Sequence, residues 1–99
     1  MGKPDAAIEA LQEAADLLRS NQPPAALYPR VLMNLGLAME AKTRPADALF
    51  YYQQSEAAYL AAALTNTAPY AGLLNNLGIF YRHQGNAGLA LAYYERALA

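Results

Sequence analysis

Three observations predict that the chain has an all-helical fold, an α-solenoid in which a repeated pair of helices is stacked. Two stretches of the chain repeat each other at a fixed offset of 42 residues, and self-similarity at a period of about 20 to 50 residues is typical of solenoids. Apolar residues recur with helical spacing, and no segment alternates with the period of a strand. The repeated residues are Leu32, Asn34, Leu35 and Gly36, which recur as Leu74, Asn76, Leu77 and Gly78, and Ala48, Leu49, Tyr51 and Tyr52, which recur as Ala90, Leu91, Tyr93 and Tyr94.

The first segment, residues 5–19, is predicted to be an amphipathic helix. Its apolar residues follow the spacing i, i+3, i+7, i+10, and its acidic residues occupy the opposite side. The two sets are Ile8, Leu11, Ala15 and Leu18, and Glu9, Glu13 and Asp16. Lys3-Pro4 echoes Arg44-Pro45 at a shift of 41, which indicates that this helix is the second helix of a repeat.

Clusters of Pro, Gly, Thr and Asn divide the rest of the chain into four more segments. These segments are predicted to be helices over residues 24–42, 45–64, 68–84 and 87–99. Thr43 and Thr67 each precede a proline by two residues, as expected for a helix cap followed by a first-turn proline. Asn86 is predicted to cap the last helix in the same way. The short connections imply that neighbouring helices are antiparallel.

Together these segments predict one domain over residues 1–99, the size of a single small domain. It divides into a half repeat at 5–22, a full repeat at 24–64 and another at 68–99, about two and a half repeats in all. Because the series opens halfway through a repeat, we expect the chain to be a segment of a longer array.

Two glycines at the same repeat position fall in the middle of predicted helices. A mid-helix glycine costs about 0.5–1 kcal/mol relative to alanine. A close helix crossing at Gly36 and Gly78 would compensate this cost, with Ala48 and Ala90 as the small residues that face it.

The composition excludes several classes of function. The net charge is −1, and the basic residues are scattered, so we expect no nucleic-acid partner. Cysteine is absent, and no apolar run resembles a signal peptide or a membrane span, so we expect no membrane association and a cytoplasmic location. Apolar residues make up 56% of the chain and charged residues only 15%, which suggests that some apolar surface meets a neighbour.

The repeated residues resemble the tetratricopeptide repeat (TPR) family, whose unit is a pair of antiparallel helices. The period of 42 exceeds the usual 34 of that family and resembles the long-period variant of kinesin light chains and of bacterial regulators and scaffolds. The extra residues would extend the second helix through Tyr59 to Leu64. The second unit matches the family pattern at Leu74, Leu77, Gly78, Tyr81, Gly85, Ala90, Tyr94 and Ala97. The first unit matches it at Leu32, Leu35, Gly36, Ala48 and Tyr52. The first unit departs from it at three positions, with Met39 in place of the aromatic residue, Thr43 in place of the turn glycine and Ser55 in place of the last alanine.

The resemblance implies a right-handed solenoid whose first helices line a concave groove for a peptide or a partner helix. Its implied groove residues are Arg30, Asn34, Asn75, Asn76, Phe80, Arg82 and His83. Asn34 and Asn76 match the groove asparagine that bonds ligand backbone, and a ligand carboxylate could meet Arg30 and Arg82. The alternatives are that each Asn bonds a neighbouring helix backbone, and that the Arg and His side chains are solvated surface residues.

Two further roles compete with the groove. The apolar flank of Leu91, Tyr94 and Leu98 suggests self-association through exposed solenoid ends. A third hypothesis is that the chain is the sensor or scaffold part of a bacterial transcriptional regulator. We expect no enzyme, no cofactor and no metal, because His83 is the only histidine and no pair of carboxylates shares a helix face near it. The eight tyrosines are interpreted as core and inter-repeat packing.

Overall fold

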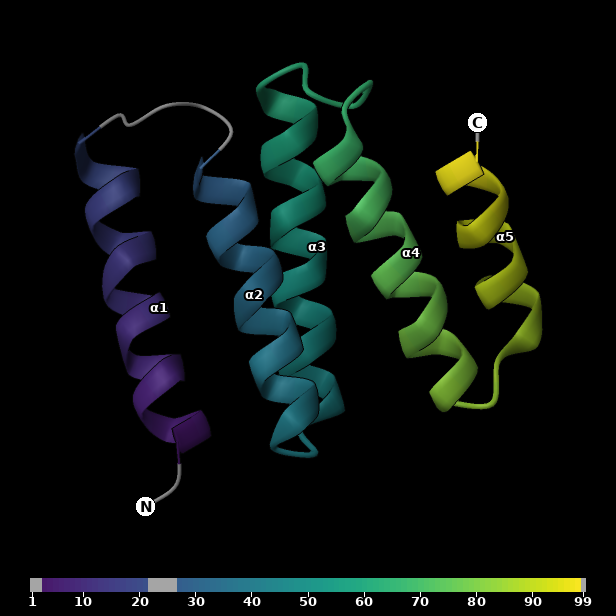
Figure 1. The fold of residues 1–99 in the computed structure, drawn as a ribbon, viewed down its shortest axis with the longest axis horizontal. Coiled ribbons are helices and arrows are strands. Elements are labelled where there is room, and N and C mark those ends of the chain that lie inside the picture. The colour runs from purple at the N-terminus through teal and green to yellow at the C-terminus, as the bar shows by residue number, and fades with distance from the viewer. Residues whose placement is uncertain (1–2, 22–26, 99) are drawn as a thin grey trace.

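The computed structural model describes the backbone of residues 3–21 and 27–98, with the side chains of all but 3–5, 18, 20 and 21 among them. Five helices make up this part of the chain, as predicted. Successive helices run in opposite directions side by side, and α2 crosses in front of α3 (Figure 1). The helices are α1 (Lys3–Asn21), α2 (Leu27–Ala41), α3 (Pro45–Ala61), α4 (Ala68–His83) and α5 (Ala87–Leu98). The all-helical class is therefore confirmed, while the predicted start of the second helix at residue 24 lies outside the described residues.

α1 is two residues longer at each end than predicted, and a larger error concerns α3, which ends at Ala61 and does not continue to Leu64. Ala63 takes a left-handed backbone conformation with φ of 57°. The Leu64 N–H then donates to the carbonyl of Tyr59, five residues earlier, at 2.9 Å. This is the 6→1 hydrogen bond of a Schellman motif. Nothing in the alanine run marks this residue as the end, since glycine is the usual choice at a left-handed position.

The predicted caps are confirmed at two positions and wrong at the third. The Thr67 hydroxyl accepts from Tyr70 N–H at 3.4 Å at the start of α4, and Asn86 Oδ1 accepts from Leu89 N–H at 3.1 Å at the start of α5. Thr43 is not a cap, because Arg44 occupies the N-cap position of α3 without a side-chain cap bond. Thr43 instead ends α2 with φ of 59°, the role that Gly85 has one repeat later.

The mid-helix glycines do allow a close crossing, but the group nearest to each glycine is an aromatic ring. A Cβ atom at Gly36 would lie 2.5 Å from the ring of Tyr52, and one at Gly78 would lie 2.6 Å from the ring of Tyr94. Tyr52 and Tyr94 are themselves one period apart. The pairs α2–α3 and α4–α5 are therefore held by the same contact, a tyrosine ring laid on a glycine backbone.

Contacts between the helix pairs are mainly aromatic. Tyr59 of α3 and Tyr70 of α4 pack edge to face with centroids 5.6 Å apart, and Tyr52 and Phe80 do the same at 6.1 Å. Ser55, at a position where the consensus has alanine, donates to the Pro29 carbonyl at 2.7 Å and so joins α3 to α2. The core residues are Ile8, Ala15, Val31, Leu32, Leu35, Met39, Ala48, Tyr52, Tyr59, Tyr70, Leu73, Leu74, Leu77 and Phe80.

The Cα atoms fill a slab of 37 × 35 × 16 Å. A slab this thin is only about two helices deep. Among the helices described, none combines the length and the apolar character needed to cross a membrane.

Candidate functional site

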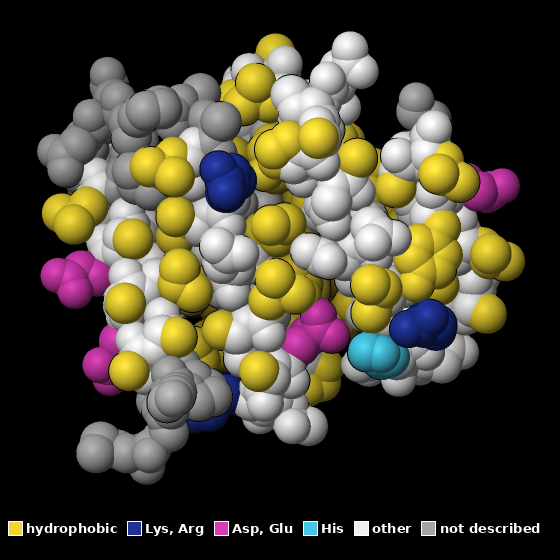
Figure 2. Space-filling model, viewed as in Figure 1, with side chains coloured by type: hydrophobic (Ala, Val, Ile, Leu, Met, Phe, Trp, Pro, Cys, Tyr) yellow, Lys and Arg dark blue, Asp and Glu magenta, His cyan; other side chains and the backbone are white. Residues whose placement is uncertain are grey.

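The candidate groove residues lie on the outer sides of α2 and α4. Arg30 and Asn34 of α2 are exposed, as are Asn75, Arg82 and His83 of α4, while Asn76 is half-buried. Figure 2 shows a face on which hydrophobic and uncharged polar side chains predominate and charged side chains are few. This face is therefore broad and weakly charged.

The two equivalent asparagines of α2 and α4 have amides that make no hydrogen bond to other described residues. Asn34 is exposed and Asn76 half-buried. The alternative that each Asn bonds a neighbouring helix backbone therefore finds no support here. An amide offers two donors and one acceptor in a plane, which suits the backbone of an extended peptide.

Phe80 differs from the other predicted groove residues because its side chain lies in the core and is only 3% exposed. Its ring packs against Tyr52 and Tyr81. The spacing that placed Phe80 beside Asn76 and His83 was right about the helix face but could not show that α3 covers it. Two exposed positions that the prediction missed are Leu37 of α2, 41% exposed, and Gly72 of α4, where a Cβ atom would meet nothing within 4 Å.

A hollow of about 190 Å³, the Glu40 hollow, lies between the ends of α2 and α4. Its lining residues are Glu40, Thr43, Arg44, Pro45, Phe80, His83 and Gln84. Glu40 Oε2 lies 3.9 Å from His83 Nδ1, a contact that is an ion pair only when the imidazole is protonated. A carboxylate therefore stands beside His83, and it comes from another helix, which the sequence pattern of α4 alone could not show.

The Glu40 carboxylate is fixed from the core side by Tyr52, whose hydroxyl donates to Glu40 Oε1. Burial raises the pKa of the Tyr52 hydroxyl well above its usual range, and the hydrogen bond to the anionic Glu40 raises that pKa further. Tyr52 thus stays a neutral donor over the physiological range. The sequence did contain a signal for the functional interest of Glu40. Glu40 is the only acidic residue of α2, and it lies one turn after Gly36, on which the Tyr52 ring packs.

A second glutamate of the same kind lies between α3, α4 and α5. Glu56 accepts from the Tyr70 hydroxyl at 2.8 Å and forms an ion pair with Arg96, which also donates to the Tyr70 hydroxyl at 2.9 Å. The Arg96 guanidinium lies 5.1 Å from the centroid of the Tyr93 ring. The pKa of Arg96 is raised mainly by its bond to Glu56, so its positive charge is secure.

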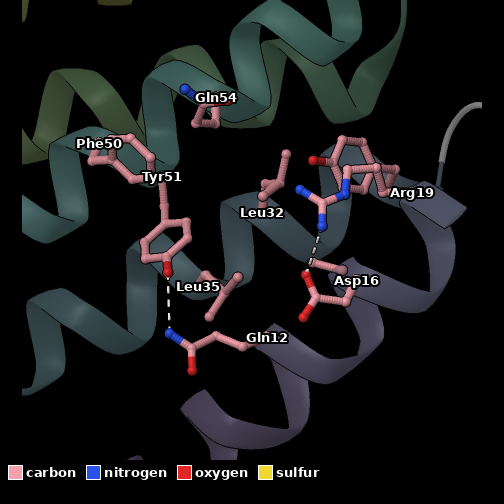
Figure 3. Close-up of a pocket in the computed structure, with 10 residues that line it drawn as sticks. Gln12, Asp16, Arg19, Leu32, Leu35, Phe50, Tyr51 and Gln54 are labelled. Carbon is pink, nitrogen blue, oxygen red and sulfur yellow. Dashed lines mark hydrogen bonds and ion pairs between the residues drawn. The ribbon is translucent and has the colours of Figure 1, made fainter.

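Another hollow of about 170 Å³ lies between α1, α2 and α3 (Figure 3). In Figure 3 Gln12 of α1 reaches the hydroxyl of Tyr51 of α3, to which its amide donates at 3.1 Å. Asp16 and Arg19 form an ion pair at 3.3 Å along the rim, with both side chains mostly exposed. Exposed ion pairs of this kind contribute little to stability. This hollow is part of the interface along which α1 packs against α2 and α3.

The candidate self-association residues on α5 do not share one environment. Leu91 and Leu98 are 61% and 89% exposed, whereas Tyr94 is half-buried with its ring against Gly78. Tyr94 therefore packs α5 onto α4, and an outward-facing apolar contact would come from the two leucines.

Within the described residues, no three His, Asp or Glu side chains are grouped closely enough to hold a metal ion. Compared with protein-family models, with curated proteins and with solved structures, the chain has no match. Its fold and its candidate site therefore rest on its own residues and contacts.

Proposed function

We propose that the chain is a non-catalytic protein-interaction module. In this proposal the helices form about two and a half units of a right-handed TPR-like solenoid, and α2 and α4 line a groove that binds a peptide or a partner helix. The repeated glycine–tyrosine contact and the left-handed residues at Thr43 and Gly85 support equivalent units.

The observation that carries the proposal is the pair of amides at Asn34 and Asn76. They occupy the same position in two successive units, on the surface of α2 and α4, and they make no hydrogen bond to other described residues. Polar groups at regular intervals along a groove suit a ligand whose own backbone groups recur at regular intervals. The low charge of this face suits a partner that is not strongly charged overall.

The test is a selection of random displayed peptides on the immobilised chain, compared with the variant Asn34→Ala/Asn76→Ala. We expect peptides that bind the wild type and lose at least about tenfold in affinity on the double variant, since each lost hydrogen bond contributes about 0.5–1.5 kcal/mol. Unchanged melting of the variant would show that the fold is intact. Peptides that bind both proteins equally would contradict the proposal.

A blocking variant gives an independent control. Gly72 lies one turn before Asn76 on the same side of α4, and its Cβ position is open, so Gly72→Phe places a ring on the groove without disturbing the core. Gly88→Phe is the matched control, since a Cβ atom there has only Asn86 Oδ1 nearby, at 3.8 Å, and lies on α5. We expect binding to be lost in the first variant and kept in the second.

Self-association is the second candidate function, favoured by the exposure of Leu91 and Leu98 on α5. Light scattering over a hundredfold range of concentration measures it directly. A mass near twice 10.7 kDa that falls in Leu91→Glu/Leu98→Glu would support pairing of two copies through α5. The mass of one chain at every concentration would exclude it.

A further inference from the structure

We propose that the Glu40 hollow binds a guanidinium group, as presented by an arginine side chain of the partner, with the Glu40 carboxylate as its counter-ion. The inference deepens the proposed function, on which it rests for the partner being a peptide or a protein. It adds the chemistry of one side chain that the partner carries and the place where that side chain binds.

The geometry of the carboxylate supports a cationic occupant. Glu40 is held in place because the Tyr52 hydroxyl donates to Oε1, and its side chain is only 22% exposed. Its other oxygen, Oε2, lies 3.9 Å from His83 Nδ1, too far for a hydrogen bond. Oε2 is therefore an acceptor that an occupant of the hollow can use.

The walls of the hollow also favour positive charge. The C-terminal ends of α2 and α4 border it, and each contributes the negative end of a helix dipole, while the N-terminal end of α3 at Pro45 contributes one positive end. Phe80 adds an aromatic residue to the lining, although it is only 3% exposed. The positive charge of Arg44, which also lines the hollow, is offset by Asp47 at 2.7 Å.

The chain itself contains an occupied example of the same arrangement. At Glu56 a tyrosine hydroxyl donates to the carboxylate, and the guanidinium of Arg96 binds both groups beside the Tyr93 ring. Glu40 has the equivalent partners, with Tyr52 as the donor and Phe80 as the neighbouring ring, and a hollow of about 190 Å³ beside it. An apolar occupant would bury this carboxylate without a counter-charge, which is costly.

The test is an NMR titration of the isotope-labelled chain with n-butylguanidinium, using n-butylurea as the neutral probe of the same shape. We expect n-butylguanidinium to give saturable shifts at the amides of Glu40, Phe80, His83 and Gln84. We expect n-butylurea to give none, and added salt to weaken the guanidinium binding, since the attraction is between charges.

The variants Glu40→Gln and Glu56→Gln make a matched pair. Glutamine keeps an oxygen acceptor for the Tyr52 hydroxyl but removes the charge, so we expect Glu40→Gln to bind n-butylguanidinium at least about tenfold more weakly, as for a lost charge-assisted hydrogen bond. Glu56→Gln, the same change at a carboxylate that Arg96 already occupies, is expected to keep the wild-type affinity for the probe at the Glu40 hollow.

The inference would be overturned by the absence of saturable shifts with n-butylguanidinium, by shifts that map elsewhere, or by equal shifts with n-butylurea. Unchanged affinity in Glu40→Gln, or selected peptides that do not depend on Glu40, would overturn it as well. The comparison of the two probes needs only the wild type, so it stands even if a variant is unstable. The small probe tests only the hollow, whereas the peptide selection tests the groove. A negative result in one experiment therefore does not imply a negative result in the other. A bound guanidinium without selected peptides would refute the groove, and selected peptides that do not depend on Glu40 would refute the hollow.

Discussion

Gly36, Gly72 and Gly78 are all helical glycines, yet at the residue scale they have different reasons to be small. A Cβ atom at Gly36 or Gly78 would collide with a tyrosine ring, whereas one at Gly72 would meet nothing. Only the first two are explained by packing within the chain. Gly72 lies on the proposed groove, where a missing side chain leaves room for a ligand.

Alanine at these positions is expected to change stability in opposite directions. Gly72→Ala should raise the free energy of unfolding by about 0.5–1 kcal/mol through helix propensity. Gly36→Ala should lower it by about 1–3 kcal/mol through overpacking, because the Tyr52 ring is fully buried and its hydroxyl is bound to Glu40. Urea unfolding measures both, and equal effects of the two substitutions would contradict the close crossing at Gly36.

Two buried tyrosines give a second contrast at this scale. The Tyr52 hydroxyl donates to Glu40, whereas the Tyr59 hydroxyl is buried with no hydrogen-bond partner among the described residues. We expect Tyr52→Phe to cost about 1–3 kcal/mol by leaving a half-buried carboxylate without its donor, and Tyr59→Phe to be neutral or stabilising. Thermal unfolding of the two variants would show the order, and a larger loss for Tyr59→Phe would refute this reading of the two hydroxyls.

At the scale of the elements, the helices themselves could be predicted because each leaves a local signal. Apolar residues at helical spacing located α1, and the Thr67 and Asn86 caps located the starts of α4 and α5. The end of α3 left no such signal, since Ala63 takes the left-handed conformation without glycine. Glu40 and His83 could not be paired from the sequence because they meet only through the packing of α2 against α4 at the far end of both helices.

The left-handed helix ends give a prediction about these elements. Thr43 has φ of 59° and Gly85 has φ of 80° at the same position of the two units. A β-branched residue is strained there, by about 1–2 kcal/mol, so Thr43→Gly should stabilise the chain by about 1 kcal/mol after the entropy of glycine is counted. Gly85→Ala should destabilise it, by backbone strain alone, since its Cβ position is open.

Chemical unfolding of the two variants measures this difference. The helical signal of the folded proteins should be unchanged, because neither residue lies within a helix. A loss of stability in Thr43→Gly would mean that the threonine side chain makes a contact worth more than the strain.

At the scale of the whole molecule, tyrosines link the helices to one another and make stability sensitive to alkaline pH. Burial is the main cause that raises the pKa of the Tyr52, Tyr59, Tyr70 and Tyr81 hydroxyls. In the unfolded chain the same groups ionise near pH 10, their ordinary value of about 10. The folded state therefore holds its protons more tightly than the unfolded state does.

The sign of the effect follows from this difference. Below about pH 10 both states keep their phenolic protons, so these groups leave stability independent of pH. Above about pH 10 the unfolded state loses protons that the folded state retains, and the free energy of unfolding falls by up to about 1.4 kcal/mol per pH unit for each protected tyrosine. Urea unfolding across this range should show a plateau and then a decline.

Tyr52→Phe isolates the contribution of one hydroxyl. Tyr52 is the most strongly affected of the four, because its burial and its bond to the Glu40 carboxylate act in the same direction. The variant should therefore lose stability less steeply above about pH 10 than the wild type, by up to about 1.4 kcal/mol per pH unit, even though it starts from a lower value. Parallel slopes for the two proteins would show that the Tyr52 hydroxyl titrates as freely in the fold as in the unfolded chain, and that Glu40 is not held by a neutral donor.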